Sequence, residues 1–367
     1  MRKATYFAMT HTEALTLLDR APTMHLASTG DAGQPILRAL HTVRVGGALY
    51  FHGAPVGEKA EALGRRAVLS YEEDVARIPS TFTDPVRACP ATTLYRSVQV
   101  EGVLGAEHEP AKKAAVLTAL MEKLQPEGGY APIDAEGPLY AKAVASIAVV
   151  RLDLEQVTGK QKLAQNRTPD ERAKVIRGLL GRGDPGDYAA VEAILDANPG
   201  DARPDLLRAR DGSRVLAHLP DERLEEAARL LEGAYWLEGV SPSDRARAFR
   251  DSAVRVGVLD DAGGLVAVAR ATTDGRVAWI FDVLVTERAR GRGLASAMLR
   301  VLLAHPRVGG ARIVRLGTRD ARPLYERFGF VDVREAPLRA YPVVEMALRP
   351  AGVPPLAPAA HGAGGSA

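Results

Sequence analysis

The feature that most constrains the fold is an apolar strand that leads through a short basic loop straight into an apolar helix. The strand is expected over Val277–Val285, the loop contains Arg290, Gly291, Arg292 and Gly293, and the helix is expected over Gly293–Leu303. A strand followed directly by a helix buries its apolar residues when the helix packs back onto the sheet. This part of the chain is therefore predicted to be a layered α/β domain.

The distribution of lysine divides the chain into two parts. All nine lysines lie in the first 174 of 367 residues, and the rest of the chain carries its positive charge on arginine. A chain of this length exceeds one ordinary core, and Asn198–Pro204 holds the Pro and Gly typical of a linker. We predict a first domain over 1–155, a helical extension and linker over 156–203, a second domain over 204–349, and a disordered tail over 350–367, where large apolar side chains are nearly absent.

Composition excludes several classes of protein. The 46% hydrophobic and 25% charged residues are typical of a globular protein and exclude a disordered or fibrous one. The net charge of +3 does not call for nucleic acid or acidic lipid as a partner. Cys89 is the single cysteine, which excludes a disulfide framework and a cysteine-built zinc site, and we interpret it as a packing residue. Without a secretory signal or a long apolar run, we expect a cytoplasmic protein that neither binds nucleic acid nor enters a membrane.

Short strands dominate the first domain, with few helices between them, which favours a small antiparallel barrel. Helices are expected over Thr12–Asp19, Gly57–Leu63 and Pro110–Leu124. Strands are expected over Met24–Ser28, Ile36–Val43, Ala48–His52, Ala67–Tyr71, Tyr95–Leu104 and Val144–Leu152, with a hairpin turn at Gly46-Gly47.

The extension and the second domain have a different pattern of expected helices and strands. Thr168-Pro169-Asp170-Glu171 is a capping box that predicts a helix to about Leu180, and Asp187–Ala197 predicts another. After the linker, strands and helices alternate, which indicates a mixed α/β sheet. Strands are expected over Arg214–His218, Val254–Leu259, Leu265–Thr272, Val277–Val285, Arg312–Gly317 and Tyr341–Leu348, and helices over Glu222–Gly233, Gly293–Leu303 and Arg322–Phe328.

The basic loop has the properties of an anion site. Gly291 and Gly293 allow a tight turn and a close approach of the backbone to a ligand. The first amide groups of a helix lack internal partners and lie at the positive end of its dipole. Arg290 and Arg292 add forked cationic donors, which suits a diphosphate. The alternative is a simple turn with solvated arginines; Walker and Rossmann phosphate motifs are both absent.

Two linked motifs give the second domain a family resemblance. Arg290-x-x-Gly293-x-Ala295 resembles the acetyl-CoA loop of the GNAT acetyltransferases, and Leu316–Asp320 followed by Leu324–Phe330 resembles the family's later strand and tyrosine helix. Asp221–Leu348 fits the family in order and spacing. Many relatives carry an asparagine where this chain has Thr318, Arg319 and Asp320. The resemblance implies that acetyl-CoA is bound by Val283, Leu284, Val285, Arg290, Gly291, Arg292, Gly293, Leu294, Ala295 and Ser296.

Two residues are candidates for catalysis. An alkylamine must lose a proton before it attacks a thioester, and a carboxylate acting through water can accept that proton. Asp282 is a lone acid inside an apolar strand, so we interpret it either as this base or as the acceptor of a structural hydrogen bond. The family resemblance gives Tyr325 the role of the acid that protonates the leaving thiolate; the alternative is a core aromatic residue.

The first domain resembles another family. Gly47–Ala54, Gly57-Glu58-Lys59 and Tyr95–Val98 resemble the split-barrel flavin-binding proteins related to pyridoxamine-phosphate oxidase, within the nitroimidazole-resistance and flavin-nucleotide-binding group. The resemblance runs from about Thr12 to Asp153 and implies a flavin such as FMN and a homodimer formed through the barrel.

Four residues are candidates for a flavin site in this barrel. Lys59 opens a helix after a glycine and is a candidate phosphate ligand, with Arg38 and Arg96 as further donors, or else it is a solvated charge. His52 is interpreted as a flavin-wall or core residue rather than a metal ligand, and no metal site is predicted.

Together these features predict a fusion of an antiparallel split β-barrel with a mixed-sheet GNAT domain. The expected activity is transfer of an acetyl group from acetyl-CoA to an amine of a small molecule or peptide. The main alternative is a flavin- or deazaflavin-dependent, nitroreductase-like enzyme with an ancillary GNAT domain. A regulatory protein in which both domains sense ligands is the third interpretation.

Overall fold

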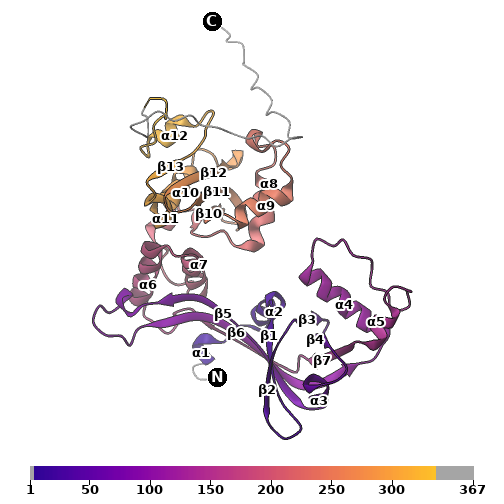
Figure 1. Cartoon of the computed structure of the whole chain (residues 1–367). Coiled ribbons are helices and arrows are strands. Elements are labelled where there is room, and N and C mark those ends of the chain that lie inside the picture. Colours follow the sequence, from indigo (N-terminus) through magenta and orange to yellow (C-terminus); the bar gives the residue numbers. More distant parts are fainter. Residues whose placement is uncertain (1–3, 336–367) are drawn as a thin grey trace. The chain divides into compact units, whose positions relative to one another are not determined.

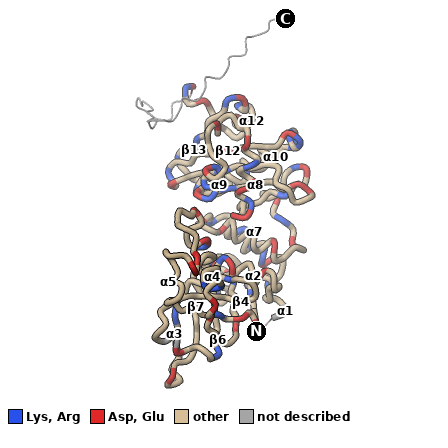
Figure 2. Tube along the Cα trace, turned by 90° about the vertical axis from the view of Figure 1, so that its right-hand side faces the viewer, with Lys and Arg blue, Asp and Glu red and all other residues tan. Residues whose placement is uncertain are grey.

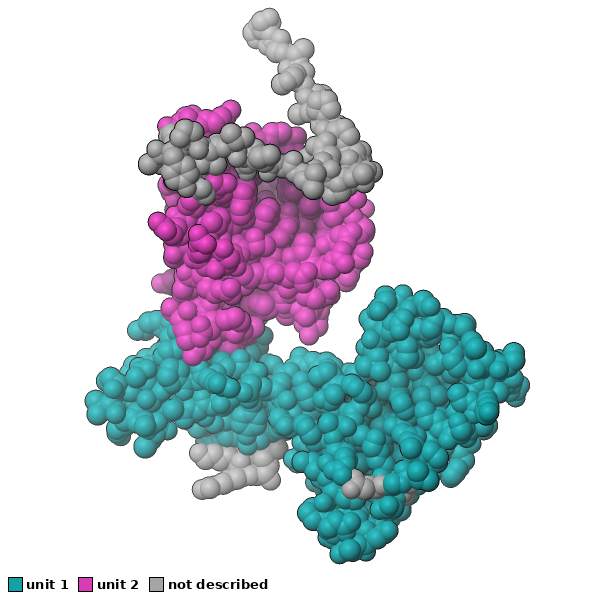
Figure 3. Space-filling view, viewed as in Figure 1, with its two compact units in different colours: residues 1–179, 193–201 teal, residues 180–192, 202–367 magenta. Residues whose placement is uncertain are grey.

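The computed structural model describes residues 4–335, so the predicted strand Tyr341–Leu348 and the tail 350–367 lie outside the described residues. The chain forms two compact units (Figure 3), with unit 1 comprising residues 1–179 and 193–201 and unit 2 comprising residues 180–192 and 202–367. Each unit has its own β-sheet. The two-domain prediction is confirmed.

Unit 1 is built on an eight-stranded antiparallel sheet (Figure 1). Its order is β2-β1-β5-β6-β7-β4-β3, and β8 pairs with β6 beside this path. The long strand β6 pairs with β5 and β8 through its first part and with β7 through its last residues, so it belongs to both halves of the sheet. The strands are β1 (Met24–Thr29), β2 (Pro35–Leu40), β3 (Val43–Val45), β4 (Ala48–Gly53), β5 (Arg66–Ile78), β6 (Thr92–Glu107), β7 (Ala148–Asp153) and β8 (Gln156–Lys162).

The core of unit 1 follows from alternation along these strands. Residues of β1 are alternately buried and exposed, as a strand with one covered face requires. Leu17 and Leu18 of a helix pack with Leu69, Val100 and Phe51 of the sheet in one apolar cluster. The helices that belong to unit 1 throughout are α1 (Ala4–Phe7), α2 (His11–Arg20), α3 (Glu58–Glu61), α4 (Pro110–Leu124) and α5 (Ala141–Ser146).

Several boundaries in unit 1 differ from the predictions. The strand predicted through Val43 is broken after Leu40, and the hairpin at Gly46-Gly47 joins β3 to β4 instead. Val144 lies in α5 rather than in a strand. Gln156–Lys162, which we assigned to the extension, is strand β8 of the sheet. Its polar sequence, Gln-Val-Thr-Gly-Lys-Gln-Lys, lacks the apolar alternation by which a strand is recognised.

Helices α6 (Pro169–Arg182) and α7 (Asp187–Ala197) match the two predicted after the barrel. The capping box is present: the Glu171 amide donates to the Thr168 hydroxyl at 3.3 Å, and the Thr168 amide donates to the Glu171 carboxylate at 2.9 Å. These two reciprocal bonds satisfy donors that the first helical turn would otherwise leave open.

Unit 2 is a five-stranded mixed sheet of order β13-β12-β11-β10-β9, in which β12 and β13 are parallel and the other pairs antiparallel. This confirms the predicted mixed sheet. Its strands are β9 (Arg214–Leu216), β10 (Val254–Leu259), β11 (Leu265–Thr273), β12 (Val277–Val285) and β13 (Ile313–Arg315), and its helices are α8 (Leu224–Leu230), α9 (Pro242–Arg250), α10 (Leu294–Ala304), α11 (Pro306–Gly309) and α12 (Arg322–Glu326).

Helix α9 was not predicted, although its start is marked in the sequence. The hydroxyl of Ser241 accepts from the amide of Asp244 at 3.1 Å, and Pro242 occupies the first turn. Three of its nine residues are arginines, and its apolar face consists only of Ala246 and Phe249, so the helical pattern is weak in the sequence. Both are buried with α8 and the sheet in the core of unit 2.

The buried carboxylate of Glu192 in unit 2 is paired. Glu192 accepts from the guanidinium of Arg203 at 2.7 Å and from the amide of Ala217 at 2.6 Å. Along the described chain, positive and negative side chains are interspersed (Figure 2). Cys89 in unit 1 is exposed, so its interpretation as a packing residue was wrong.

Candidate functional site

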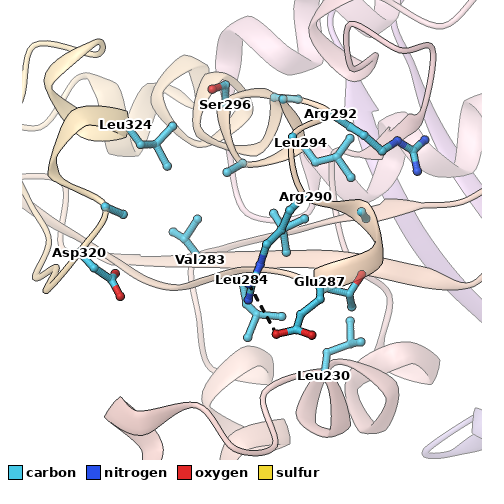
Figure 4. Close-up of a pocket in the computed structure, with 18 of the residues that line it drawn as sticks. Leu230, Val283, Leu284, Glu287, Arg290, Arg292, Leu294, Ser296, Asp320 and Leu324 are labelled. Atoms are coloured by element: carbon cyan, nitrogen blue, oxygen red, sulfur yellow. Dashed lines mark ion pairs between the residues drawn. The ribbon is translucent and has the colours of Figure 1, made fainter.

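Unit 2 contains a cavity of about 1530 Å³ around the end of β12 and the start of α10. Its wall includes Val283 and Leu284 of the strand, the basic loop and the first turn of α10 (Figure 4). Leu324 of α12 and the segment from Glu232 to Trp236 complete it. The predicted acetyl-CoA residues, from Val283 to Val285 and from Arg290 to Ser296, all line this one cavity.

The first turn of α10 is open to a ligand. Gly293 is the N-cap residue, with φ 79° and ψ 12°, and no side chain of the described residues caps the helix. Gly291 also has a positive φ, 77°. A Cβ atom at either glycine would meet nothing within 4 Å, so the backbone conformation and not crowding requires glycine there. The uncapped amides therefore face the cavity as an anion site.

The two loop arginines have different surroundings. Arg290 is exposed, and its guanidinium lies 3.6 Å from the carboxylate of Glu287, three residues earlier in the chain (Figure 4). Arg292 forms an ion pair with Asp211 at 2.5 Å and donates to the Ser213 hydroxyl at 2.9 Å. Arg290 is thus free to turn toward a ligand, whereas Arg292 fastens the loop to the segment before β9.

Strand β12 changes its pairing where it reaches the cavity. Its parallel pairing with β13 ends at Trp279, opposite Arg315, so the following backbone groups of β12 do not pair with β13. On its other side the register with β11 shifts between Val268 and Arg270, which marks a β-bulge. Beyond the bulge, Val283–Val285 line the cavity beside this open edge.

Asp282 lies in that bulge and is held by two donors. Its φ of 54° is in the left-handed region. The indole N–H of Trp236 donates to one carboxylate oxygen at 2.9 Å, and Nε of Arg270 donates to the other at 2.5 Å. The side chain is 4% exposed and does not line the cavity. This geometry favours the structural interpretation of Asp282 over the general base.

Tyr325 is buried next to the cavity and not in its wall. Its ring makes an edge contact with Phe330, with the centroids 6.0 Å apart, while its neighbour Leu324 lines the cavity. Burial raises the pKa of its hydroxyl, and Tyr235 and Asp320, two wall residues, raise it further. The hydroxyl therefore keeps its proton at neutral pH, and residues of the cavity wall influence its pKa.

Sequence reasoning missed an aromatic part of the wall. Tyr235 and Trp236 pack edge to face with centroids 4.9 Å apart, and the guanidinium of Arg319 stacks on the Tyr235 ring at 3.7 Å. Two adjacent aromatic residues in a chain with 5% aromatics were the available signal. A large, partly exposed ring stacked by a cation fits a wall that contacts a ligand.

The barrel residues proposed for a flavin are only partly brought together. The side chain of Lys59 lies over Gly53, where a Cβ atom would come within 3.5 Å of its amine. The pKa of His52 is lowered by partial burial and by the positive charges of Lys59 and His41. Lys59 is thus a cation close to His52 at the end of β4, and the lowered pKa favours the neutral form of His52.

Arg96 lies elsewhere. It donates to Glu73 at 3.0 Å, near the far end of the β5–β6 ladder. His52 pairs with Val149, which pairs with Glu107 of β6. At about 3.3 Å per residue, the span from residue 96 to residue 107 is roughly 36 Å. Arg96 and His52 cannot contact the same flavin phosphate within one chain.

The last predicted flavin residue is Arg38, which lies on β2. Arg38 is exposed on β2, and it donates to the carbonyl of Leu37 at 2.7 Å. Within residues 4–335, no group of three or more His, Cys, Asp or Glu side chains is arranged to hold a metal ion. In the same range, no helix is long and apolar enough to cross a bilayer.

Comparisons with known proteins give the same two classes. Residues 10–161 match the family model described as Pyridoxamine 5'-phosphate oxidase, and residues 222–330 match the Acetyltransferase (GNAT) family. The chain is therefore a fusion of a split-barrel domain of the pyridoxamine 5'-phosphate oxidase type with a GNAT domain. A search of curated proteins gives no match.

Solved structures resemble one or the other half. The flavocytochrome Anf3 from Azotobacter vinelandii is 20% identical, with a TM-score of 0.38 over 44% of this chain and 72% of that one. The FAD and heme binding protein from Mycobacterium smegmatis is 22% identical, with a TM-score of 0.36 over 43% and 73%. A putative GNAT acetyltransferase from Xanthomonas campestris pv. campestris is 27% identical, with a TM-score of 0.31 over 37% and 93%.

The structural role of Asp282 can be tested by substitution. Asp282→Asn keeps an acceptor for Trp236 but removes the charge that faces Arg270. Losing one partner of a buried ion pair costs about 3–5 kcal/mol, so the urea unfolding free energy of unit 2 is expected to fall by a few kcal/mol. Trp236→Phe, which removes one hydrogen bond to a charged group, should cost about 1.5–3 kcal/mol. Unchanged stability of Asp282→Asn together with lost activity would restore Asp282 as a base.

Proposed function

We propose that unit 2 is an N-acetyltransferase that takes its acetyl group from acetyl-CoA and gives it to an amine of a small molecule or peptide. The observation that carries this proposal is the first turn of α10, which has no side-chain cap among residues 4–335 and opens into a cavity bordered by the edge of β12 that β13 leaves open beyond Trp279. One surface offers a diphosphate site, and the adjoining one offers backbone groups to an extended arm. The GNAT family match supports the same assignment.

The diphosphate of coenzyme A would bind to the amides at Gly293–Ser296, where the helix dipole favours negative charge. Arg290 would swing from Glu287 to the phosphates, because a doubly charged diphosphate is a stronger partner than one exposed carboxylate. Arg292 stays with Asp211 and keeps the loop in its conformation.

The pantetheine arm would lie along β12 from Val285 toward Val283. Its amide groups would pair with the strand edge that β13 leaves open beyond Trp279. An N–H of this edge would hold the thioester carbonyl and stabilise the oxyanion formed on attack. The bulge at Asp282 sets the direction in which this edge of β12 runs along the cavity.

The transfer forms a C–N bond and breaks the C–S bond of the thioester. The attacking amine must first give up its proton, and water in the cavity passes this proton to a carboxylate. Glu232 lines the cavity and has no ion-pair partner in the described part of the chain, so it is available to accept it. The leaving thiolate takes a proton from the Tyr325 hydroxyl, which its raised pKa keeps protonated.

The barrel supports a second candidate function. The match of residues 10–161 to the pyridoxamine 5'-phosphate oxidase family and the position of the Lys59 amine over Gly53, beside His52, favour a bound flavin, with FMN as the first candidate. Lys59 would hold its phosphate, and His52 would lie beside its ring. A flavin- or deazaflavin-dependent reductase then remains the alternative activity. Since Arg96 is remote from Lys59, it would reach a flavin only across a homodimer.

Reversing the charge of Arg290 tests the diphosphate site. In Arg290→Glu an anion stands against the phosphates, so the affinity for acetyl-CoA is expected to fall by about 100-fold or more, since charge-assisted contacts are worth roughly 1.5–3 kcal/mol each. Titration calorimetry measures it. Arg288→Glu is the matched control, because Arg288 is exposed in the same loop, pairs with Asp260 and does not line the cavity. Equal affinity in all three proteins would reject the loop assignment.

Removing the hydroxyl of Tyr325 tests the acid. Tyr325→Phe is expected to slow turnover by about 100-fold, a usual share for a general acid, while acetyl-CoA binds within about twofold of the wild-type affinity. The rate is measured as thiol released from acetyl-CoA with a small alkylamine and a lysine peptide as acceptors. Because the raised pKa keeps the hydroxyl protonated, the wild-type rate should not fall as the pH rises toward the usual tyrosine value of about 10. An unaltered rate, with chemistry limiting, removes Tyr325 from the mechanism.

Native mass spectrometry followed by nucleotide extraction tests the barrel. We expect a dimer mass that carries one flavin per chain, and a Lys59→Glu protein that has lost the flavin while remaining dimeric. Arg87→Glu is a suitable control, since Arg87 is an exposed arginine of unit 1 that pairs locally with Asp84. A colourless wild-type protein that takes up neither FMN nor FAD on incubation contradicts the flavin assignment.

A further inference from the structure

Three arginines of the cavity wall come together where the segment Arg208–Ser213, here called the crossing segment, meets α10. Arg300 of α10 donates to the carbonyl of Arg208 at 2.9 Å, and Arg292 donates to the hydroxyl of Ser213 at 2.9 Å. Arg210 lies between these two contact points in the crossing segment. Arg210, Arg292 and Arg300 all line the cavity.

The charges of this group do not cancel. Asp211, also in the wall, forms the ion pair with Arg292 and neutralises it. In the described part of the chain, Arg210 and Arg300 have no carboxylate partner; Arg300 makes the single bond to Arg208, and both side chains are exposed. Two positive charges are therefore left facing the cavity, with forked donors that suit a phosphate.

These two charges lie apart from the diphosphate site. Arg300 follows Gly293 by seven residues, about two helical turns, which at 1.5 Å per residue places it about 10 Å along α10 from the N-cap. This arrangement can therefore bind a second anionic group of the same ligand at that distance from the first. The crossing segment also precedes residues 222–330, the part that matches the GNAT family, so its arginines are no part of the matched region.

We infer that Arg210 and Arg300 bind the phosphomonoester on the ribose 3′ carbon of coenzyme A. This inference rests on the proposed acetyl-CoA site. A phosphomonoester carries a charge between about −1.5 and −2 at neutral pH, and in coenzyme A it is attached to the ribose that adjoins the diphosphate. With the diphosphate on the amides of α10, the ribose reaches the crossing segment, and two guanidinium groups meet its second anion. The protein thereby distinguishes coenzyme A from its 3′-dephospho form.

The experiment compares two ligands on the full-length chain by titration calorimetry: coenzyme A and 3′-dephospho-coenzyme A. The wild-type protein is expected to bind coenzyme A at least about tenfold more tightly. In Arg210→Ala/Arg300→Ala this difference should shrink to within about twofold, through weaker binding of coenzyme A alone. Arg276→Ala is the matched control, because Arg276 is exposed in unit 2 and does not line the cavity.

Retained affinity for 3′-dephospho-coenzyme A shows that the double variant is folded and its diphosphate site intact. Arg210→Ala alone, which removes no ion pair or hydrogen bond within residues 4–335, should give part of the effect. Equal wild-type affinity for the two ligands, or a difference that survives the double substitution, overturns the inference and leaves the acetyl-CoA proposal standing. Failure of the wild-type protein to bind either ligand overturns both.

Discussion

The ion pair between Asp282 and Arg270 is the interaction on which the cavity depends. A carboxylate buried to this extent is tolerated when donors surround it, and Trp236 supplies the second one. The pair holds β12 in a bulge that regular pairing with β11 would remove. Without the bulge, Val283 would continue the alternation of the strand, and the edge of β12 beside the cavity would run in a different direction.

The same interaction joins three elements that form different walls. Arg270 belongs to β11, Asp282 to β12, and Trp236 to the segment after α8, next to Tyr235. The position of the aromatic wall is therefore fixed relative to the strand edge by the hydrogen bond from Trp236 to Asp282. This arrangement separates the residues that build the site from the open amides of α10, which would touch a ligand.

Much of this could be predicted from the sequence, and the limits have physical causes. The loop and start of α10 were predictable because glycine spacing and helix polarity are local properties. The cavity residues from Val283 to Val285 and from Arg290 to Ser296 followed from one short segment of the chain. The role of Asp282 did not, since its partners Trp236 and Arg270 are distant in sequence and only the fold brings them to it. Residues 156–162 were misassigned because pairing with β6, rather than their own polar composition, makes them a strand.

In the barrel, resemblance grouped residues that the sheet separates. Arg96 and His52 both lie in recognisable motifs, but the length of β6 keeps them far apart in one chain. Sequence proximity to a motif carries no information about the register of a long ladder, in which each residue of displacement moves a side chain by about 3.3 Å. His52 and Lys59 are close because β4 leads directly into α3.

The anchoring of Arg292 to Asp211 and Ser213 has a consequence for how the second domain can be isolated. A fragment that began at residue 222 would keep each motif of the matched family, yet its phosphate loop would lose that anchor. It would also lack β9, so that the hydrogen-bonding edge of β10 would be bare and ready to pair with another molecule. The functional limit of this domain therefore lies well upstream of the region that similarity defines.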